Sequence, residues 1–351
     1  YSCQLSKLFL PRRQLAVLGH TFGGRFMTTS SSLSNEQFAF LDLKPEVGVI
    51  VDEVHRGLSL EAKAISPKFF YDERGSELFD AITELPEYYV TRTEMALFEA
   101  HMEEIAAALE ENICVIEYGS GSTKKIRRLL DVLKPEAYVP VDISGDYLLS
   151  NAQALLDDFP ALKIFPVCAD ITQSFDLPVQ VNELRPLGFY PGSSIGNFEP
   201  AQAVDFLRRV HVTLGQGGYF LVGVDAKKDI SILEAAYDDA AGVTAQFNLN
   251  TLVHLNEKLG ADFDLDHFEH FSRYNADQGC IQMFLKSTVA QQVNLVGKVI
   301  SFAEGELLHT ENSYKYAKEE FIALAQSAQF ECLKSWQDSN QWFSLFLLRA
   351  C

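Results

Sequence analysis

The sequence predicts an α/β protein with a doubly wound core and a second α+β lobe. Three observations predict this fold class. From Cys114 onward, short apolar runs alternate with helix-like stretches. A glycine-rich turn containing Gly119 and Gly121 follows the first apolar run. The alternation stops between residues 229 and 315 and then resumes. Alternation of this kind is typical of parallel βαβ units, and a long insert in it predicts a second lobe.

The apolar runs predict five consecutive strands of one sheet. They are nearly continuous in Val, Ile, Leu and Phe, as expected for strands that are covered on both faces. The stretches between them have helical periodicity, so the connections can cross back over the sheet and give a Rossmann-like topology. The expected strands are 113–117, 137–141, 163–167, 187–190 and 218–224, and the expected helices are 124–132, 147–159 and 200–214.

Two segments lie outside this alternation. One precedes it and is rich in aromatic residues and mostly helical in pattern, between residues 43 and 92. The other is the insert, which has a helix-like stretch at 230–259 and strand-like runs at 282–287 and 292–302. Because a ligand of a doubly wound sheet binds beyond the carboxyl ends of its strands, we expect the site between the core and this extra material.

The chain after the insert predicts the end of the sheet. It has a helix-like stretch at 318–328 and two strand-like runs at 331–336 and 342–349, separated by a short loop that suits a hairpin. The resulting division places a substrate-binding lobe in residues 35–92 and 228–315, and a cofactor-binding core in residues 93–227 and 316–351.

Composition excludes several classes of protein. The 351 residues are 47% hydrophobic and 22% charged, as in a globular protein of one large domain or two modest ones. The net charge of -19 disfavours binding to nucleic acid or anionic membranes, and no apolar run approaches the roughly 20 residues of a membrane helix. The six cysteines are scattered, which favours reduced thiols in the cytoplasm. The sequence gives no oligomeric state, and a monomer is our working expectation.

Residues 1–34 differ from the rest of the chain. They contain Lys7, Arg12, Arg13 and Arg25 but no acid, and they are rich in Ser and Thr. This composition resembles an organelle transit peptide, but it also fits a disordered leader or an extension upstream of Met27. We favour the disordered leader and expect residues 1–34 to be dispensable for activity.

The sharpest local signal is the run from Val115 to Lys125. A buried strand ends in Glu117, and Gly119 and Gly121 then form a turn into a helix. A dinucleotide site would need a third glycine where Lys124 stands, so a pyrophosphate cradle is disfavoured. An acidic residue followed by Gly-x-Gly fits S-adenosylmethionine, which has an amino-acid end, a ribose and an adenine but no phosphate.

Three further residues fall where that cofactor requires them. Asp142 ends the second strand, where its carboxylate can accept both ribose hydroxyls. Asp170 ends the third strand, where it can accept from the adenine amino group. Lys125 can meet the cofactor's carboxylate. Each aspartate alone could be a helix cap. However, the glycine turn, Asp142 and Asp170 follow the first, second and third strands in turn, and this arrangement favours the cofactor.

Seven ordered motifs resemble one family. They run from about residue 65 to the C-terminus: PKFFYDERGS (67–76), LPEYYVTRTE (85–94), EYGSG (117–121), GSSIGN (192–197), AYDDAAGVTA (236–245), ADFDLD (261–266) and TENSYKY (310–316). The chain resembles the histidine-specific Nα-methyltransferases, which form the betaine hercynine on the route to ergothioneine. The resemblance implies an L-histidine Nα-methyltransferase that uses S-adenosyl-L-methionine, with L-histidine as its small-molecule substrate.

The resemblance also assigns the site. The family's cofactor contacts fall on Gly119, Lys125, Asp142, Asp170 and Ile171, where Ile171 replaces an expected aromatic residue. Its histidine contacts fall on Tyr88, Asn197, Tyr237, Glu311 and Ser313.

These side chains suit a free amino acid. Asn197 and Tyr237 can hold the amine and carboxylate, and Glu311 with Ser313 can accept and donate around an imidazole. Tyr71 and Tyr88 are candidates to orient the amine, although no residue is assigned as a base. Aromatic faces near Tyr71 and Tyr88, with Phe69, Phe70 and Tyr89, could attract the methylated ammonium.

Two alternatives remain open. The acceptor could be another aromatic amino acid such as tryptophan, although an apolar indole would leave Glu311 buried without a partner. The chain could also be a regulatory module that binds the cofactor without turnover. His267 and His270, with two nearby aspartates, have spacing that suits a metal, but we interpret them as surface or cap residues of a helical stretch.

Overall fold

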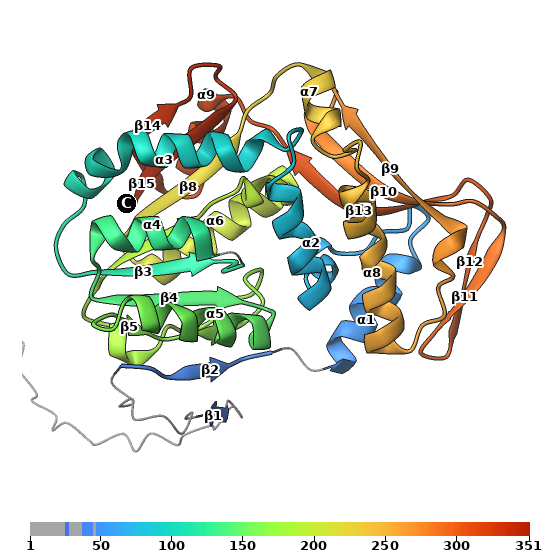
Figure 1. Cartoon of the computed structure of the whole chain (residues 1–351), viewed down its shortest axis with the longest axis horizontal. Helices are drawn as coiled ribbons and strands as arrows, with labels where there is room; N and C mark the ends of the chain where they lie inside the picture. Colours follow the sequence, from blue (N-terminus) through green and yellow to red (C-terminus); the bar gives the residue numbers. More distant parts are fainter. Residues whose placement is uncertain (1–24, 28–36, 45–46, 122) are drawn as a thin grey trace, which may run out of the picture.

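The larger layer of the protein is a ten-stranded sheet. The computed structural model describes residues 25–27, 37–44, 47–121 and 123–351. The strands of this sheet are β1 (Arg25–Met27), β2 (Phe40–Asp42), β3 (Ile113–Tyr118), β4 (Ala137–Asp142), β5 (Lys163–Ile164), β6 (Val167–Cys168), β7 (Arg185–Tyr190), β8 (Tyr219–Asp225), β14 (Phe330–Gln337) and β15 (Phe343–Ala350). They lie in the order β1-β2-β6-β4-β3-β7-β8-β15-β14, with β5 beside β4 (Figure 1).

The direction of the strands confirms the doubly wound α/β prediction. Neighbours from β2 to β8 are parallel, whereas β15 is antiparallel to both β8 and β14. The chain leaves β3 toward β4 on one side and reaches β7 on the other. The strand order therefore reverses at β3, and a ligand crevice is expected beyond the carboxyl ends of β3 and β7.

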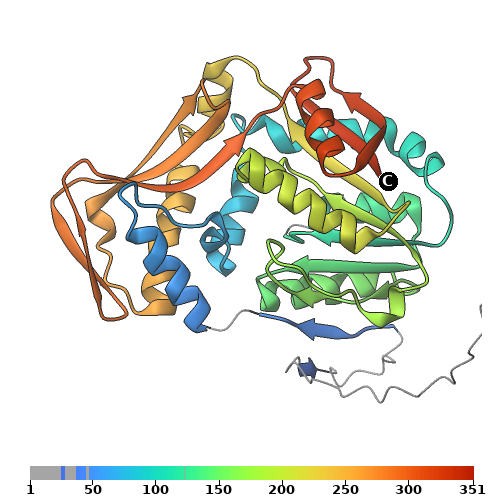
Figure 2. The same ribbon diagram turned by 180° about the vertical axis from the view of Figure 1, so that it is seen from behind.

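Helices cover both faces of this sheet, as the continuous apolar strands require. The helices α3 (Tyr89–Ala107), α4 (Thr123–Leu133) and α5 (Gly145–Asp158) lie on the face seen in Figure 1. The helices α6 (Pro200–Leu214) and α9 (Lys318–Ser327) lie on the other face, seen in Figure 2. Two short 3₁₀ turns, η2 (Val179–Val181) and η3 (Ser194–Asn197), lie before and after β7. Most predicted helices and strands of the core are confirmed to within a few residues, but the expected single strand at 163–167 is wrong. It is two short strands, β5 and β6, separated at Phe165 and Pro166, because a proline has no N–H to donate to a neighbouring strand.

The remaining elements form a second lobe beside the sheet (Figures 1 and 2). Its β13 (Leu307–Tyr314), β10 (Cys280–Ser287) and β9 (Phe268–Asn275) form an antiparallel sheet, and β11 (Gln291–Leu295) pairs with β12 (Lys298–Phe302). Its helices are α1 (Val47–Leu58), η1 (Pro67–Phe70), α2 (Glu73–Thr83), α7 (Ile230–Ala235), α8 (Val243–Leu259) and η4 (Leu265–His267). Phe69, Leu252, Phe268 and Phe302 belong to its own buried apolar core.

The insert differs from the sequence prediction in four places. The expected helix at 230–259 is two helices, α7 and α8, because the chain turns between them at Gly242 with φ of 70°. The expected strand at 292–302 is the β11–β12 hairpin, which turns at Val296 and Gly297. The strands β9 and β13 are not predicted by the sequence. Their side chains alternate between buried and exposed positions over only part of their length, so a period of two is hard to recognise.

Two expected boundaries are wrong. The sequence assigns Phe40–Asp42 to the second lobe, but these residues form β2 and pair with β6 of the core sheet. The expected boundary at residues 92–93 falls inside α3, which runs unbroken from Tyr89 to Ala107 and packs on the core. Of the leader, residues 25–27 form β1 and pair with β2; the rest of residues 1–34 lies outside the described part of the chain. Within the described part, no helix is both long enough and apolar enough to cross a membrane.

Candidate active site

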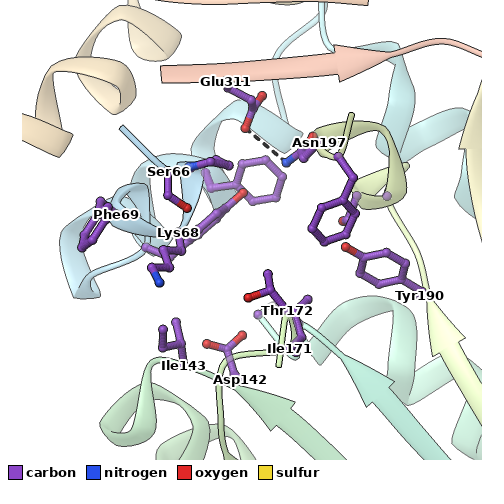
Figure 3. Close-up of a pocket in the computed structure, with 18 of the residues that line it drawn as sticks. Ser66, Lys68, Phe69, Asp142, Ile143, Ile171, Thr172, Tyr190, Asn197 and Glu311 are labelled. Atoms are coloured by element: carbon purple, nitrogen blue, oxygen red, sulfur yellow. Dashed lines mark hydrogen bonds between the residues drawn. The ribbon is translucent and has the colours of Figure 1, made fainter. Parts of the chain in front are cut away.

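A cleft of about 1170 Å³ lies between the core sheet and the second lobe. All five predicted cofactor contacts line it: Gly119, Lys125, Asp142, Asp170 and Ile171. Figure 3 shows Asp142 and Ile171 on one side of this space and Glu311 on the opposite side. The core strands and the second lobe thus face each other across one cleft.

The glycine turn after β3 presents open backbone to the cleft. Gly119 has φ of 75°, a conformation that glycine adopts without steric cost. The N–H groups of Gly119 and Ser120 both donate to the Val141 carbonyl, at 2.8 and 3.0 Å, which fixes the turn against β4. A Cβ added at Gly119 or Gly121 would meet no atom within 4 Å, so both positions face free space. The turn therefore fits a ligand that lies close to the backbone.

Acidic residues stand at the ends of β3 and β4, where Glu117 is buried and Asp142 is half-buried. Glu117 accepts a short hydrogen bond from the Tyr138 hydroxyl, and burial raises the pKa of Glu117 to about 7 despite this bond. Asp142 accepts from the Ser144 N–H at 2.8 Å. Burial also raises the pKa of Asp142, against the lowering effect of its backbone hydrogen bonds. A buried carboxylate gains from any ligand that donates to it.

Asp170 has partners within the protein. Its Oδ1 accepts from the N–H and hydroxyl of Thr172, at 2.9 and 2.6 Å, and its Oδ2 lies 3.1 Å from Lys68 Nζ. Burial would raise the pKa of Asp170, but Thr172 and Lys68 outweigh it and hold that pKa below its usual value. Lys68 also lies 2.6 Å from Glu53 and so joins the second lobe to the core. The sequence prediction misses Lys68 as a site residue, although it lies in the motif at 67–76.

Lys125 has a buried partner. Its Nζ lies 2.5 Å from Oε2 of Glu94, a residue of α3 whose side chain is fully buried. The Gly192 N–H also donates to Glu94, at 2.8 Å. Glu94 is therefore a bridge that fixes Lys125 against the loop after β7. The sequence prediction misses Glu94 as well, although it ends the motif at 85–94.

A smaller cavity, here called the inner pocket, opens into the cleft. All five predicted acceptor contacts line it: Tyr88, Asn197, Tyr237, Glu311 and Ser313. Tyr88, Asn197 and Glu311 line the cleft as well, so the two spaces share a boundary. The inner pocket draws on the start of α3, on η3, on the turn after α7 and on β13, which are far apart in the sequence.

Polar contacts organise the inner pocket. The Asn197 amide donates to Glu311 Oε2 at 3.2 Å (Figure 3), and the hydroxyls of Tyr237 and Ser313 lie 2.7 Å apart. Burial raises the pKa of Glu311 to about 8, against the lowering effect of the Lys315 charge. Next to Glu311, a bulge in the β10–β13 pairing leaves Thr310 without a partner residue. Bulges re-aim side chains, and this one lies beside the pocket.

Lys315 and Asp225 lie directly behind the inner pocket and are not predicted by the sequence. The Lys315 side chain is fully buried, and its Nζ lies 2.9 Å from both the Tyr237 and Ser313 hydroxyls and 2.8 Å from Asp225 Oδ2. The alternation of an extended chain could have found it, because Glu311, Ser313 and Lys315 are spaced by two residues and point to one side.

Aromatic side chains form the walls of the inner pocket. Tyr71 and Tyr88 line it as predicted, together with Phe79 and Phe247. Burial raises the pKa of both Tyr71 and Tyr88 well above its usual value, so both phenols stay neutral and can donate. Of the other aromatic residues proposed, Phe69 lines only the cleft, whereas Phe70 and Tyr89 lie in the buried core.

The interpretation of His270 as a surface or cap residue of a helical stretch is wrong. His270 lies on β9, where its Nδ1 accepts from Asn248 and its Nε2 donates to the Tyr237 carbonyl, at 2.8 and 2.9 Å. Burial lowers its pKa, in keeping with a neutral ring. His270 therefore supports the backbone of a pocket residue. His267 is exposed and pairs with Asp264. Across the described residues, no group of three or more His, Cys, Asp or Glu side chains could hold a metal.

Comparisons with known proteins agree with the motifs. The family of SAM-dependent, histidine-specific methyltransferases matches residues 50–350. The chain is 39% identical over 301 residues to histidine N-alpha-methyltransferase of Mycolicibacterium smegmatis, covering 84% of this chain and 93% of that protein. It is 36% identical over 302 residues to the protein of the same name from Mycobacterium tuberculosis, with coverage of 84% and 93%. An L-tryptophan methyltransferase of Psilocybe serbica is 25% identical over 322 residues, covering 82% and 89%. The chain therefore belongs to the family of histidine-specific, S-adenosylmethionine-dependent methyltransferases.

Proposed function

We propose that this protein transfers methyl groups from S-adenosyl-L-methionine to the α-amino group of L-histidine and so forms the trimethylated betaine hercynine, the first step of ergothioneine biosynthesis. The observation that carries the proposal is the inner pocket, where a buried carboxylate and a pair of hydroxyls open into a cleft with a glycine turn. The names of the two histidine N-alpha-methyltransferases support the same acceptor.

The cleft fits the cofactor on the chemistry of its donors and acceptors. The turn at Gly119 leaves space for a ligand against the backbone, and Asp142 offers a half-buried acceptor for the ribose diol. Lys125 offers a cation for the cofactor's carboxylate, held in place by Glu94. Asp170 offers an acceptor for the adenine amino group, which it would share with Lys68. Ile171 offers an apolar surface where an aromatic residue was expected.

The polar groups that line the inner pocket match the donors and acceptors of histidine; the pocket itself is small, about 40 Å³, so the rest of the amino acid would lie in the adjoining cleft. A neutral imidazole has one N–H and one acceptor nitrogen. Glu311 can accept from the N–H, and Ser313 can donate to the other nitrogen. Tyr88, Asn197 and Tyr237 remain for the amine and carboxylate. An apolar side chain in the same position would leave the buried Glu311 carboxyl without a ligand partner, which disfavours it.

The residues of the chain supply alignment and attraction for the methylated ammonium. The cofactor's sulfonium, when bound, supplies an already activated methyl group. The neutral phenols of Tyr71 and Tyr88 stand where the inner pocket meets the cleft and can orient the lone pair of the amine. Alignment of this kind removes much of the entropic barrier. The faces of Tyr71, Phe79 and Tyr88 can attract the ammonium as it gains methyl groups, through cation–π contact.

Mass spectrometry of L-histidine incubated with the protein and cofactor tests the proposal. Masses of one, two and three added methyl groups are expected. No product, with intact binding of S-adenosylhomocysteine, would instead support a regulatory module. Calorimetric titration of L-histidine and L-tryptophan, each with saturating S-adenosylhomocysteine, separates the two acceptors. Tighter binding of tryptophan would favour the alternative, which the more distant tryptophan methyltransferase represents.

We also propose a cellular compartment and an oligomeric state for the enzyme. We place it in the cytoplasm, supported by free thiols at Cys114, Cys168, Cys280, Cys332 and Cys351. A single copy of the chain contributes all the residues assigned to the site, which is compatible with activity as a monomer.

A further inference from the structure

A buried ammonium lies behind the two hydroxyl groups of the inner pocket. Lys315 Nζ lies 2.9 Å from Tyr237 Oη, 2.9 Å from Ser313 Oγ and 2.8 Å from Asp225 Oδ2, with no exposed side-chain surface. An ammonium group has three donors and no acceptor. These three partners therefore use all the hydrogens of Lys315, and none of them is directed at a ligand.

This arrangement determines where the hydroxyl hydrogens point. Because Lys315 can only donate, the oxygens of Tyr237 and Ser313 must both accept from it. The two oxygens also lie 2.7 Å apart, so one hydroxyl hydrogen lies between them. The other hydroxyl hydrogen is then directed away from Lys315, toward the inner pocket that both side chains line. A nearby cation also makes a hydroxyl a stronger donor.

Two buried ammonium groups share one carboxylate behind the pocket. Asp225 Oδ2 meets Lys315, and its Oδ1 meets Lys228, whose side chain is also almost fully buried. The Tyr89 hydroxyl donates to the same carboxylate at 2.7 Å and stays neutral. Of the two ammonium groups, Lys315 is the one that contacts Tyr237 and Ser313, so its charge polarises the hydroxyl groups of the pocket. An amino acid brings a carboxylate that can accept from the hydroxyl hydrogen directed at the pocket.

We propose that Lys315 is a positioning residue for the acceptor: it directs the hydroxyl hydrogen that the Tyr237–Ser313 pair leaves free toward the ligand and supplies, through Tyr237, a positive charge behind the carboxylate of the amino acid. This inference rests on the proposed function, because it takes a free amino acid as the acceptor. It predicts that Lys315 makes the pocket prefer an amino acid over the same molecule without its carboxylate.

Lys228 provides a matched control. It is a second buried ammonium on the same Asp225 carboxylate, but its other contact is the Tyr89 hydroxyl at 2.5 Å. Lys228→Met therefore removes one buried positive charge without removing a contact to Tyr237 or Ser313. A role of Lys315 in stability alone predicts that Lys315→Met and Lys228→Met change ligand binding alike.

The experiment is calorimetric titration of L-histidine and of L-histidinol, in which a hydroxymethyl group replaces the carboxylate, with saturating S-adenosylhomocysteine. In Lys315→Met the Kd for histidine should rise about tenfold or more, as for loss of a charge-assisted hydrogen bond, while the Kd for histidinol rises only about twofold. The histidine-to-histidinol preference should therefore fall. In Lys228→Met this preference should equal that of the wild type, and S-adenosylhomocysteine should bind all variants within about twofold of the wild type.

A second variant is needed if Lys315→Met does not fold because the buried Asp225 carboxylate has lost one of its two ammonium partners. Lys315→Met/Asp225→Asn removes the opposite charges together, and the same fall in preference is expected. The inference is overturned if the double variant retains the wild-type preference, if Lys228→Met lowers it equally, or if the wild type binds both ligands equally. Failure of the wild type to methylate histidine in the mass-spectrometric assay would instead overturn the proposed function itself.

Discussion

The side-chain amide of Asn197 donates to Glu311 Oε2 at 3.2 Å, across the boundary between the core and the second lobe (Figure 3). Asn197 belongs to η3, after the core strand β7, and Glu311 belongs to β13 of the second lobe. The two residues also line both the cleft and the inner pocket. A single hydrogen bond therefore joins Asn197, which is proposed to hold the amine or carboxylate of the substrate, to Glu311, which is proposed to bind its imidazole.

Glu311 is predicted to set specificity for the imidazole. At a pH above about 8, where Glu311 is ionised, Glu311→Ala should lower kcat/KM for histidine by about tenfold to a hundredfold, because a charge-assisted hydrogen bond contributes roughly 1.5–3 kcal/mol. Tryptophan has an indole N–H but no acceptor nitrogen, so it should lose less and the histidine-to-tryptophan ratio should fall. Steady-state kinetics with both amino acids measures the ratio. An unchanged histidine-to-tryptophan ratio would show that Glu311 does not contact the ring of the substrate.

Glu311 is also predicted to make stability depend on pH. Its pKa of about 8 in the folded protein lies above the ordinary value of 4.5, so the folded state binds this proton more tightly than the unfolded chain. The associated stabilisation is present below about pH 4.5 and is lost as the pH rises to about 8. Relative to Glu311→Gln, which cannot ionise, the wild type should lose on the order of a few kcal/mol across this window.

Urea unfolding of both proteins between about pH 5 and 8.5 measures this difference. Glu117, whose pKa is about 7, titrates in both proteins and cancels in the comparison. A difference in unfolding free energy that stays constant with pH would mean that Glu311 ionises normally in the folded state.

Asp142 is predicted to bind the ribose. Asp142→Ala should weaken binding of S-adenosylhomocysteine by roughly 1.5–3 kcal/mol for each hydroxyl bond lost, because a half-buried charged acceptor is removed. Calorimetry gives the Kd, and histidine binding should change far less. The exposed Asp146, four residues later at the start of α5, provides the control variant Asp146→Ala. Equal affinity in Asp142→Ala and Asp146→Ala would remove Asp142 from the cofactor site.

Lys125 is predicted to recognise the amino-acid end of the cofactor. Lys125→Met should weaken S-adenosylhomocysteine by about tenfold or more, but should leave 5′-methylthioadenosine, which lacks the amino-acid end, within about twofold. The variant should also lose about 3–5 kcal/mol of stability, since Glu94 remains buried without its charge partner. Titration with both ligands tests this selectivity. A parallel loss for the two would indicate that Lys125 only stabilises the loop.

The sequence determined the core of the fold because its signals are local. The strands at β3, β4, β7 and β8 are continuous apolar runs, and Gly119 and Gly121 mark the turn after β3. In a parallel sheet, the carboxyl ends of neighbouring strands meet at one edge, so the residues that follow each strand converge without further information. The order of strands and turns along the chain is therefore sufficient to predict that Gly119, Asp142 and Asp170 lie near one another.

The sequence also predicted the acceptor residues, but only through motifs. Tyr88, Asn197, Tyr237 and Glu311 come from separate segments, and no periodicity of the chain relates them. The motifs predicted these residues as substrate contacts, and in the tertiary structure they all line the inner pocket. The strands β9 and β13, the break at Gly242 and the place of β2 in the core sheet were missed, because long-range pairing rather than local propensity decides them.

Only the tertiary structure decided the partners of the charged side chains. Several contacts of buried charges join residues that are far apart in the chain. They are Lys125 with Glu94, Lys68 with Asp170, and Lys315 with Asp225 and Tyr237. Burying a charge is costly unless a partner satisfies it, so each of these charged side chains requires a partner in the folded protein. The sequence determined which charges the protein carries, whereas the packing of two lobes against each other determined which of them meet behind the acceptor.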